Sequence, residues 1–189
     1  LWGYVNEANP DVMEMQINCA YKHGVNVFIY DWYWYDGRPF LENCLNEGFL
    51  GAKNNEKMKF FLMWANHTAS TLWCKNLKDK NIPIWDGAVD RKTFEHIVHR
   101  TIEKYFSHPS YYKIDGKPVY MIFNPINLVK GLGGIEETKR ALEYFREKVK
   151  EAGFEGLDLQ LAAWGERTNN VSGVDGEKTL STKEVVSVL

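Results

Sequence analysis

The fold is decided by residues 25–35, whose sequence is VNVFIYDWYWY. The apolar run from Val25 to Tyr30 is β-branched and aromatic, which predicts a strand buried on both faces. Aromatic side chains occupy six of the eight positions from Phe28 to Tyr35, more than a core strand needs. We therefore expect the second half of this stretch to serve a ligand as well as the core.

Outward from this stretch, short apolar runs alternate with amphipathic helices. The preceding helix has Asn9 as its N-cap and Pro10 at its first position, and it ends before Gly24. Its expected buried stripe is Met13, Ile17, Ala20 and Tyr21. A polar connection over residues 65–90 is longer than usual, and such connections are usually functional. The other predicted strands cover residues 59–64, 119–123 and 157–163; the other predicted helices cover residues 40–45, 91–105 and 135–152, with one more beginning at the Ser181-x-x-Glu184 capping box.

This order of helices and strands predicts an α/β fold with a parallel sheet and right-handed crossovers. A closed eight-stranded barrel needs roughly 250 residues, whereas the chain has 189. We therefore expect a partial (β/α)8 TIM barrel made of about four consecutive βα units. An open parallel α/β sheet is the alternative.

Charge and composition exclude several classes of protein. The chain has 23 basic and 25 acidic side chains, so it lacks the basic excess of a nucleic-acid binder or a membrane-surface protein. It contains no apolar run long enough for a transmembrane helix. Cys19, Cys44 and Cys74 show no CxxC spacing and no adjacent His. We expect three structural thiols, and neither a metal site nor a cofactor.

Functional side chains are expected where the parallel strands end, since α/β proteins place their sites at the carboxyl edge of the sheet. The residues there combine flat rings with carboxylates and amides. This combination suits sugars, because ring faces stack on the sugar while its hydroxyls take directional hydrogen bonds. Asp31 and Glu166 are the carboxylates at strand ends, and we expect them to be catalytic because glycoside hydrolysis needs two carboxyl groups. The candidate substrate-binding residues are Tyr33, Trp34, Trp64, Asn66, His67, Asn124 and Trp164.

Several of these residues have a structural alternative. Asp31 and Tyr33 alternate with Trp32 and Trp34, so one pair must face the interior or mouth of the barrel and the other the helices. One of the two Trp residues can therefore belong to the core. His67 is equally well explained as a hydrogen-bonded scaffold residue.

Four stretches together resemble the WbsX-like proteins, which are relatives of glycoside hydrolase family 99, the endo-α-mannosidase family. They are residues 10–35, FLMWAN at 61–66, WDG at 85–87 and HPSYYKIDGKPV at 108–119. The resemblance covers residues 3–166 and implies a (β/α)8 barrel that acts on glycans.

The sequence differs from the family pattern in three ways. The family has a Glu at the position of His67. Nothing between Trp164 and Leu189 matches its Asn-Glu-Trp-x-Glu-like motif, and the first barrel strand expected before Leu1 is missing. The resemblance therefore implies that the principal catalytic pair lies outside this chain.

We therefore expect residues 1–189 to be a single partial glycoside-hydrolase-type barrel domain, truncated at both ends. The intact protein would cleave internal glycosidic bonds of an oligosaccharide or polysaccharide. The expected roles are ring stacking for Trp34 and Trp64, hydroxyl binding for Asp31, Asn66 and Asn124, and acid, base or hydroxyl binding for Glu166 unless it only pairs with Arg167.

Two other functions remain as alternatives. One is a glycosyltransferase of polysaccharide synthesis, although the chain has no D-x-D motif and no diphosphate-binding loop. The other is a non-catalytic sugar-binding module. Export to the periplasm or the exterior is plausible because polymeric glycans are degraded there. Half a barrel leaves two unpaired strand edges, which predicts self-association of the isolated chain.

Overall fold

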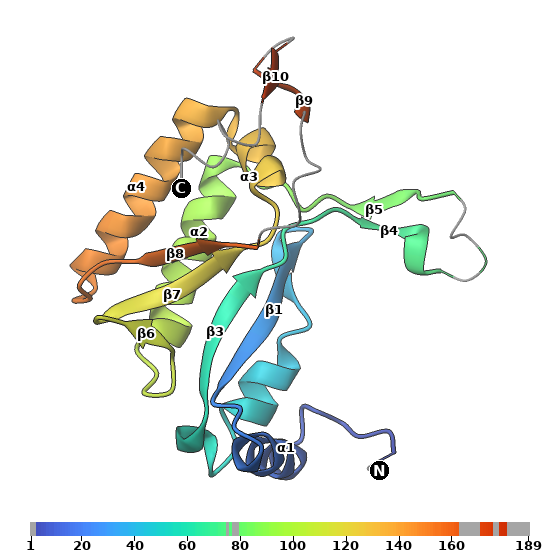
Figure 1. The fold of residues 1–189 in the computed structure, drawn as a ribbon. Coiled ribbons are helices and arrows are strands. Elements are labelled where there is room, and N and C mark those ends of the chain that lie inside the picture. The colour runs from blue at the N-terminus through green and yellow to red at the C-terminus, as the bar shows by residue number, and fades with distance from the viewer. Residues whose placement is uncertain (1–2, 75, 77–79, 163–170, 176–177, 181–189) are drawn as a thin grey trace.

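The computed structural model of the chain describes residues 3–74, 76, 80–162, 171–175 and 178–180. Its centre is a sheet in which four parallel strands lie side by side in chain order (Figure 1). Two short strands pair antiparallel with this sheet, one with β1 and one with β7. The parallel strands are β1 (Val27–Tyr35), β3 (Lys59–Trp64), β7 (Lys117–Ile122) and β8 (Asp158–Leu161), and the antiparallel strands are β2 (Arg38–Phe40) and β6 (Lys113–Ile114).

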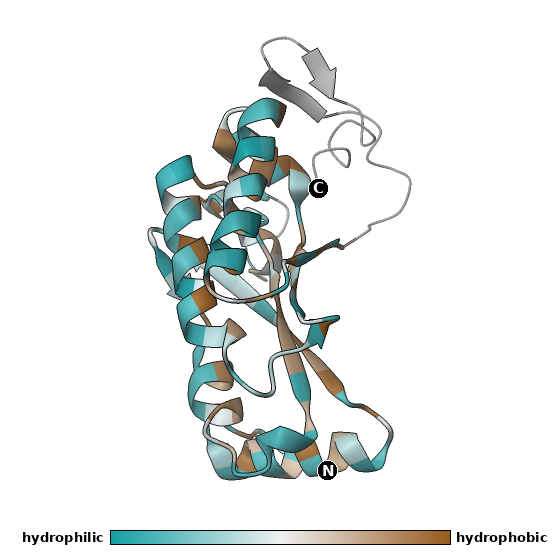
Figure 2. Cartoon of the chain, turned by 90° about the vertical axis from the view of Figure 1, so that its left-hand side faces the viewer, coloured by the Kyte–Doolittle hydropathy of each residue, from teal (hydrophilic) through white to brown (hydrophobic). Residues whose placement is uncertain are grey.

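The sheet curls into an open half-barrel, and the helices cover its convex face (Figure 1). Figure 2 shows that these helices turn mainly hydrophilic residues away from the sheet. The fold is therefore mixed α/β with a curled open sheet. The helices are α1 (Pro10–Lys22), α2 (Arg91–Thr101), α3 (Pro125–Leu132) and α4 (Ile135–Glu151), with π-type turns at Cys44–Phe49 and Ile102–Phe106 and 3-10 turns at Asn55–Lys57 and Thr71–Trp73.

The core lies between the sheet and the helices. Leu62 and Trp64 of β3 are fully buried, and the Trp64 ring packs against Phe94 of α2 with the ring centroids 6.3 Å apart. On the next strand, Tyr120 packs edge-on against Phe145 of α4 at 5.3 Å. Alternate residues of each strand thus meet the helices, which leaves the intervening residues on the concave face.

Several predicted elements are confirmed together with the local signals that predicted them. The Asn9 side chain accepts a hydrogen bond from the Asp11 backbone N–H at the start of α1, and Gly24 follows that helix with a left-handed φ of 83°. Asp90 caps α2 by accepting from the Thr93 N–H at 2.8 Å. These caps satisfy N–H groups that a helix cannot bond internally, which is why they identify helix starts so well.

Two predictions about the first third of the chain are wrong. Tyr21, expected on the buried stripe of the first helix, is exposed. The helix predicted over residues 40–45 is absent, because Phe40 pairs with β1 as part of β2 and Leu41 has a left-handed φ of 59°. Helical structure begins only at Cys44.

Strand β1 is longer than predicted. The apolar run suggested an end at Tyr30, but the strand continues to Tyr35. Its last residues are held on both sides, since Trp32 pairs in parallel with β3 and Tyr33 to Tyr35 pair antiparallel with β2. The aromatic stretch is therefore regular strand, and its side chains alternate strictly between the two faces of the sheet.

The long connection between β3 and α2 forms an arm that projects from the carboxyl edge of the sheet (Figure 1). Its strands are β4 (Ala69–Ser70) and β5 (Pro83–Trp85), which pair antiparallel. A second small ladder joins β9 (Val171–Asp175) to β10 (Lys178–Leu180). The helix predicted to begin at Ser181 lies outside the described residues. In the part of the chain that the structure describes, no helix is both long and apolar enough to cross a bilayer.

Candidate functional site

Strand β1 presents two chemically different faces. Trp32 and Trp34 are buried and face the helices. The Trp32 indole N–H donates to Glu42 at 2.6 Å, and the Trp34 ring lies 5.4 Å from that of His96 on α2. Asp31 is exposed on the opposite, concave face. The alternation expected from the sequence is thus present, with both Trp residues on the helix side.

A cluster of rings lies at the carboxyl end of this concave face. Trp85, at the base of the arm, stacks on Tyr35 with ring centroids 5.7 Å apart and an interplanar angle of 25°. Phe40 meets Trp85 edge-on at 5.4 Å, and each of these two side chains is 36% exposed. Apolar rings with open faces at a sheet edge can bind a ligand. We refer to Tyr33, Tyr35, Phe40, His67, Trp85 and Phe123 as the mouth cluster.

His67 lies within the mouth cluster. Its ring centroid is 5.4 Å from that of Phe123 and 6.0 Å from that of Tyr33. The Tyr35 hydroxyl donates to the His67 carbonyl oxygen at 2.8 Å and lies 3.3 Å from the ring atom Nδ1. The residue is half-buried. It therefore has the contacts expected of a hydrogen-bonded scaffold residue and also the partly accessible position expected of a substrate-binding residue.

The acidic and phenolic groups of β1 influence one another. Burial raises the pKa of the Tyr33 phenol, and the charge and hydrogen bonding of the adjacent Asp31 carboxylate raise it further. Burial also raises the pKa of Tyr35 to about 12, with a smaller contribution from Tyr33. Both phenols therefore stay protonated at neutral pH. Hydroxyl donors, an acceptor carboxylate and flat rings are the groups that a sugar ring can engage together.

The arm is anchored tightly at its base. Gly87 passes so close to the loop after β3 that a Cβ atom there would lie 2.5 Å from the His67 carbonyl oxygen. Beside it, Asp86 accepts from the Thr68 hydroxyl at 3.2 Å and lies 3.8 Å from the Lys130 ammonium group of α3. Only glycine fits this approach, and the approach holds Trp85 against the mouth cluster.

The two predicted amide residues hold the loops after β3 and β7 in different ways. Asn66 is 1% exposed; its side-chain oxygen accepts from the Asn124 N–H, and its side-chain nitrogen donates to the Asn124 carbonyl oxygen, both at 2.7 Å. The Asn124 side chain caps α3 by accepting from the Asn127 N–H at 3.0 Å. Both side chains are therefore engaged with backbone, and that of Asn66 joins the carboxyl ends of β3 and β7.

Trp34 and Trp64, the rings expected to stack on sugars, are 4% and 0% exposed. Both lie between the sheet and α2, beside His96 and Phe94 respectively. Within the described residues, neither indole N–H has a hydrogen-bond partner. A ring enclosed on both faces cannot receive a sugar, so in this structure the two Trp residues belong to the core.

A buried carboxylate on the helix side was not anticipated. Glu42 accepts hydrogen bonds from the Trp32 indole at 2.6 Å, the Arg100 guanidinium at 2.6 Å, the Tyr105 hydroxyl at 2.9 Å and the Asn46 amide at 3.1 Å. The Glu42 side chain is 9% exposed. This network joins β1 to α2 behind the mouth cluster. No local sequence pattern predicts it, because its members other than Asn46 lie 10 to 63 residues from Glu42 in the sequence.

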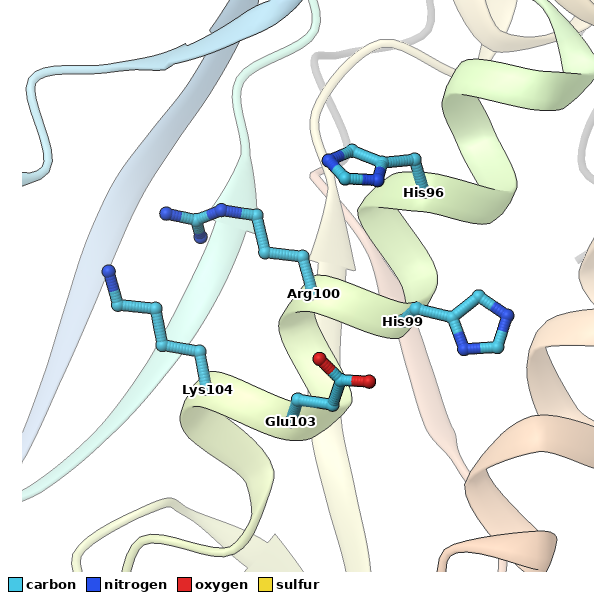
Figure 3. A pocket seen from close by; sticks show the side chains of 5 residues that line it. All are labelled: His96, His99, Arg100, Glu103 and Lys104. Carbon is cyan, nitrogen blue, oxygen red and sulfur yellow. The ribbon is translucent and has the colours of Figure 1, made fainter.

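A groove of about 540 Å³ on α2 and the turn after it is lined by His96, His99, Arg100, Glu103 and Lys104 (Figure 3). It lies on the helix side of the sheet, away from the mouth cluster. Two of its polar side chains already have protein partners: His99 Nε2 is 2.7 Å from the Tyr144 hydroxyl, and Arg100 is bound to Glu42. Over the described part of the chain, no three His, Cys, Asp or Glu side chains are arranged to hold a metal ion.

Two candidate residues, Trp164 and Glu166, lie outside the described residues. Trp85, Tyr35 and Phe40 were not among the predicted site residues. A signal for Tyr35 existed, because it continues the alternation that already placed Tyr33 on one face. Trp85 carried a weaker signal, as an aromatic residue before an Asp-Gly turn in an unusually long connection.

The family model described as glycosyltransferase WbsX matches residues 2–187, nearly the whole chain. The chain belongs to the WbsX family. This is a carbohydrate-active, glycosyltransferase-like family related to glycoside hydrolase family 99. The WbsX match thus confirms the family resemblance.

Two curated relatives of this WbsX-family chain are the WxcX proteins of two strains of Xanthomonas campestris pv. campestris, each described as uncharacterized. Each is 27% identical over 123 residues, which are 65% of this chain and 17% of the relative. The chain thus matches about a sixth of the length of these relatives. No solved structure matches the chain significantly.

Proposed function

We propose that this WbsX-family chain forms one side of the glycan site in an enzyme that hydrolyses internal glycosidic bonds. The observation that carries the proposal is the mouth cluster. The exposed rings of Trp85 and Phe40 lie at the same edge of the sheet as the Asp31 carboxylate and the Tyr33 phenol. Stacking surfaces beside a carboxylate are what binding and cleavage of a sugar chain require.

The proposal places residues 1–189 in a larger (β/α)8 barrel. Four adjacent parallel strands in chain order, with helices on the convex face, are the arrangement that half of such a barrel would have. In this barrel Asp31 would act on the scissile bond or hold a hydroxyl beside it. Glu166 remains the second proposed carboxylate and Trp164 a proposed substrate-binding residue, and both lie outside the described residues. The principal catalytic pair would be completed by residues beyond this chain.

Ring stacking is assigned to the mouth cluster instead of the two buried Trp residues. Trp85 offers one open face because its other face lies on Tyr35. Tyr33 and Phe40 extend this surface along β1 and β2. Asn66 and Asn124 would support the site by holding the loops, since their side-chain amides already bond to backbone.

A glycosyltransferase is the second candidate, because the matching family model carries that description. The two candidates differ in their second substrate: a hydrolase consumes water, whereas a transferase consumes an activated sugar. Stacking rings and a carboxylate serve both reactions, but the chain has neither the D-x-D motif nor the diphosphate-binding loop that a transferase would use.

The test is an assay of the intact protein against α-mannans and related oligosaccharides, with and without nucleotide sugars. A hydrolase is expected to release new reducing ends and shorter oligosaccharides without any nucleotide sugar. Release of nucleoside diphosphate with chain elongation would support the transferase. Binding without either reaction would support a sugar-binding module, and absence of both binding and turnover would overturn the glycan proposal.

Replacing Trp85 with Ala is expected to weaken oligosaccharide binding by roughly 5- to 30-fold, since a lost stacking face is worth about 1–2 kcal/mol. Trp85→Phe should retain most of the affinity. Isothermal titration calorimetry with mannan oligosaccharides measures the difference.

The matched control is Ile84→Ala. Ile84 neighbours Trp85 on the arm and is 50% exposed, but it has no ring that could stack on a sugar. It should bind with unchanged affinity. Equal losses in both variants would mean that the arm as a whole, and not the Trp85 face, determines binding.

Self-association is expected when residues 1–189 are produced alone. The outer edge of β8 has no strand partner among the described residues, and β2 covers only the last three residues of β1. Exposed strand edges pair with other chains. Light scattering coupled to size-exclusion chromatography should show oligomers that grow with concentration. A monomer across the concentration range would argue against the half-barrel proposal.

A further inference from the structure

We propose that His67 is a hydrogen-bond acceptor for a sugar hydroxyl, with its neutral ring held in one tautomer by the surrounding backbone and Tyr35. The inference rests on the proposed glycan site and names one specificity-determining atom in it, the ring nitrogen Nε2.

The position and plane of the His67 ring are set by its neighbours. Phe123 of the loop after β7 meets the ring edge-on, at an interplanar angle of 61° and 5.4 Å between centroids. Tyr33 of β1 lies on another side at 6.0 Å. Contacts from β1 and from the loop after β7 restrict rotation of the imidazole, which pre-organises its nitrogens for a ligand.

The tautomer follows from the partners of Nδ1. This atom lies 3.3 Å from the Ala65 carbonyl oxygen, which can only accept a hydrogen bond. It also lies 3.3 Å from the Tyr35 hydroxyl. That hydroxyl uses its hydrogen on the His67 carbonyl oxygen, at the shorter distance of 2.8 Å, so it presents a lone pair to Nδ1.

Both partners of Nδ1 are therefore acceptors, and Nδ1 must carry the hydrogen in the neutral ring. The other nitrogen, Nε2, then holds the lone pair. Within the described residues no hydrogen-bond partner is assigned to Nε2, and the side chain is half-exposed beside the aromatic surface. A hydroxyl of a sugar stacked on the mouth cluster is a donor of the required kind.

With this tautomer, His67 and Asp31 would accept hydrogen bonds from sugar hydroxyls in different ways. The carboxylate is a charged acceptor, whereas Nε2 is a neutral acceptor with a single lone pair in the ring plane. A ligand hydroxyl must therefore point along one direction to reach it. His67 would select the orientation of one hydroxyl, the property by which epimeric sugars differ.

The tautomer can be measured without any ligand. Labelling of the intact protein with ¹⁵N-histidine gives imidazole signals from its His residues alone, and those missing in His67→Asn identify His67. We expect the neutral ring to show a protonated Nδ1 and an unprotonated Nε2. The opposite tautomer would overturn the inference, whatever the protein binds.

Two variants test the role of Nε2 directly. The amide nitrogen of His67→Asn overlies Nδ1, so it can keep the bond to the Ala65 carbonyl but has no atom at Nε2. The longer His67→Gln places its amide near Nε2 and supplies an acceptor oxygen there. We expect mannan oligosaccharide binding to weaken about tenfold in the Asn variant and less than about threefold in the Gln variant.

The outcomes separate this inference from the proposed function. Glycan binding that is equally strong in the wild type and in His67→Asn would overturn the role of Nε2 but leave the glycan site intact. Equal losses in the Asn and Gln variants would assign His67 to packing alone. No glycan binding by the wild type would overturn the proposed function and, with it, the sugar as partner of His67.

Discussion

Replacing Asp31 with Asn is expected to reduce the glycosidase activity of the intact protein by about 10²–10⁴-fold, the range for loss of a positioned acid or base. Asn has the same size but neither charge nor a transferable proton. Because Asp31 is exposed, its replacement should leave the free energy of unfolding nearly unchanged. Initial rates on α-mannan, together with urea unfolding, measure both effects.

Asp36→Asn is the matched control for this variant. Asp36 is an exposed residue in the turn after β1 with a φ of 51°, a conformation that Asn adopts readily. Its activity should equal that of the wild type. The Asp31 variant should also lower the pKa of Tyr33, because the carboxylate charge that raises it is gone. Retained activity with this lowered pKa would show that Asp31 is near the site but takes no part in the reaction.

Replacing Glu42 with Gln is expected to lower the free energy of unfolding by about 3–5 kcal/mol, the range for breaking one partner of a buried ion pair. The amide leaves the half-buried Arg100 charge without its carboxylate, and it places an NH₂ donor among groups that are themselves donors, the Trp32 indole and the Tyr105 hydroxyl. Urea unfolding measures the loss. Glu95→Gln is the control, since Glu95 forms an exposed ion pair with Arg91 one helical turn away; its effect should be below about 0.5 kcal/mol.

The Glu42 network also predicts how stability depends on pH. Burial alone would raise the pKa of the carboxyl group, but hydrogen bonds from Trp32 and Tyr105 and the charge of Arg100 lower it below the usual value. The pKa in the unfolded chain is about 4.3. The stabilisation is therefore fully present above that pH and is lost as the pH falls through the lower, folded-state pKa. The stability gap between wild type and Glu42→Gln should narrow below about pH 4.

Local sequence signals were sufficient to predict much of the fold. Asn9 and Asp90 mark helix starts because their side chains accept hydrogen bonds from free backbone N–H groups. Gly24 marks a helix end because glycine readily adopts a left-handed φ. The run over residues 59–64 is a buried parallel strand with the predicted bounds. These features depend on neighbours in the chain, so the sequence displays them directly.

The sequence did not show which aromatic side chains are buried in the core and which are exposed at the sheet edge. An aromatic residue at a strand end suits a ligand or a core equally, and the outcome for Trp34 and Trp64 depended on whether α2 packs over them. The same holds for Trp85, whose placement depends on the path of an arm with no periodic pattern. Tyr35 could have been placed on the concave face, but only by extending β1 past an Asp residue that disfavours strands.

The amide pairing of Asn66 has a consequence for producing the protein. Asn66-His67-Thr68 matches the acceptor sequence for N-linked glycosylation. In the folded chain Asn66 is 1% exposed, and its side-chain nitrogen, the atom that would carry the glycan, donates a hydrogen bond to the Asn124 carbonyl oxygen. A glycan could be attached only before folding, and it would then prevent the two loops from joining. In a eukaryotic secretory pathway, glycosylation of Asn66 would compete with folding. A host that does not glycosylate this sequence is therefore the suitable source of the protein.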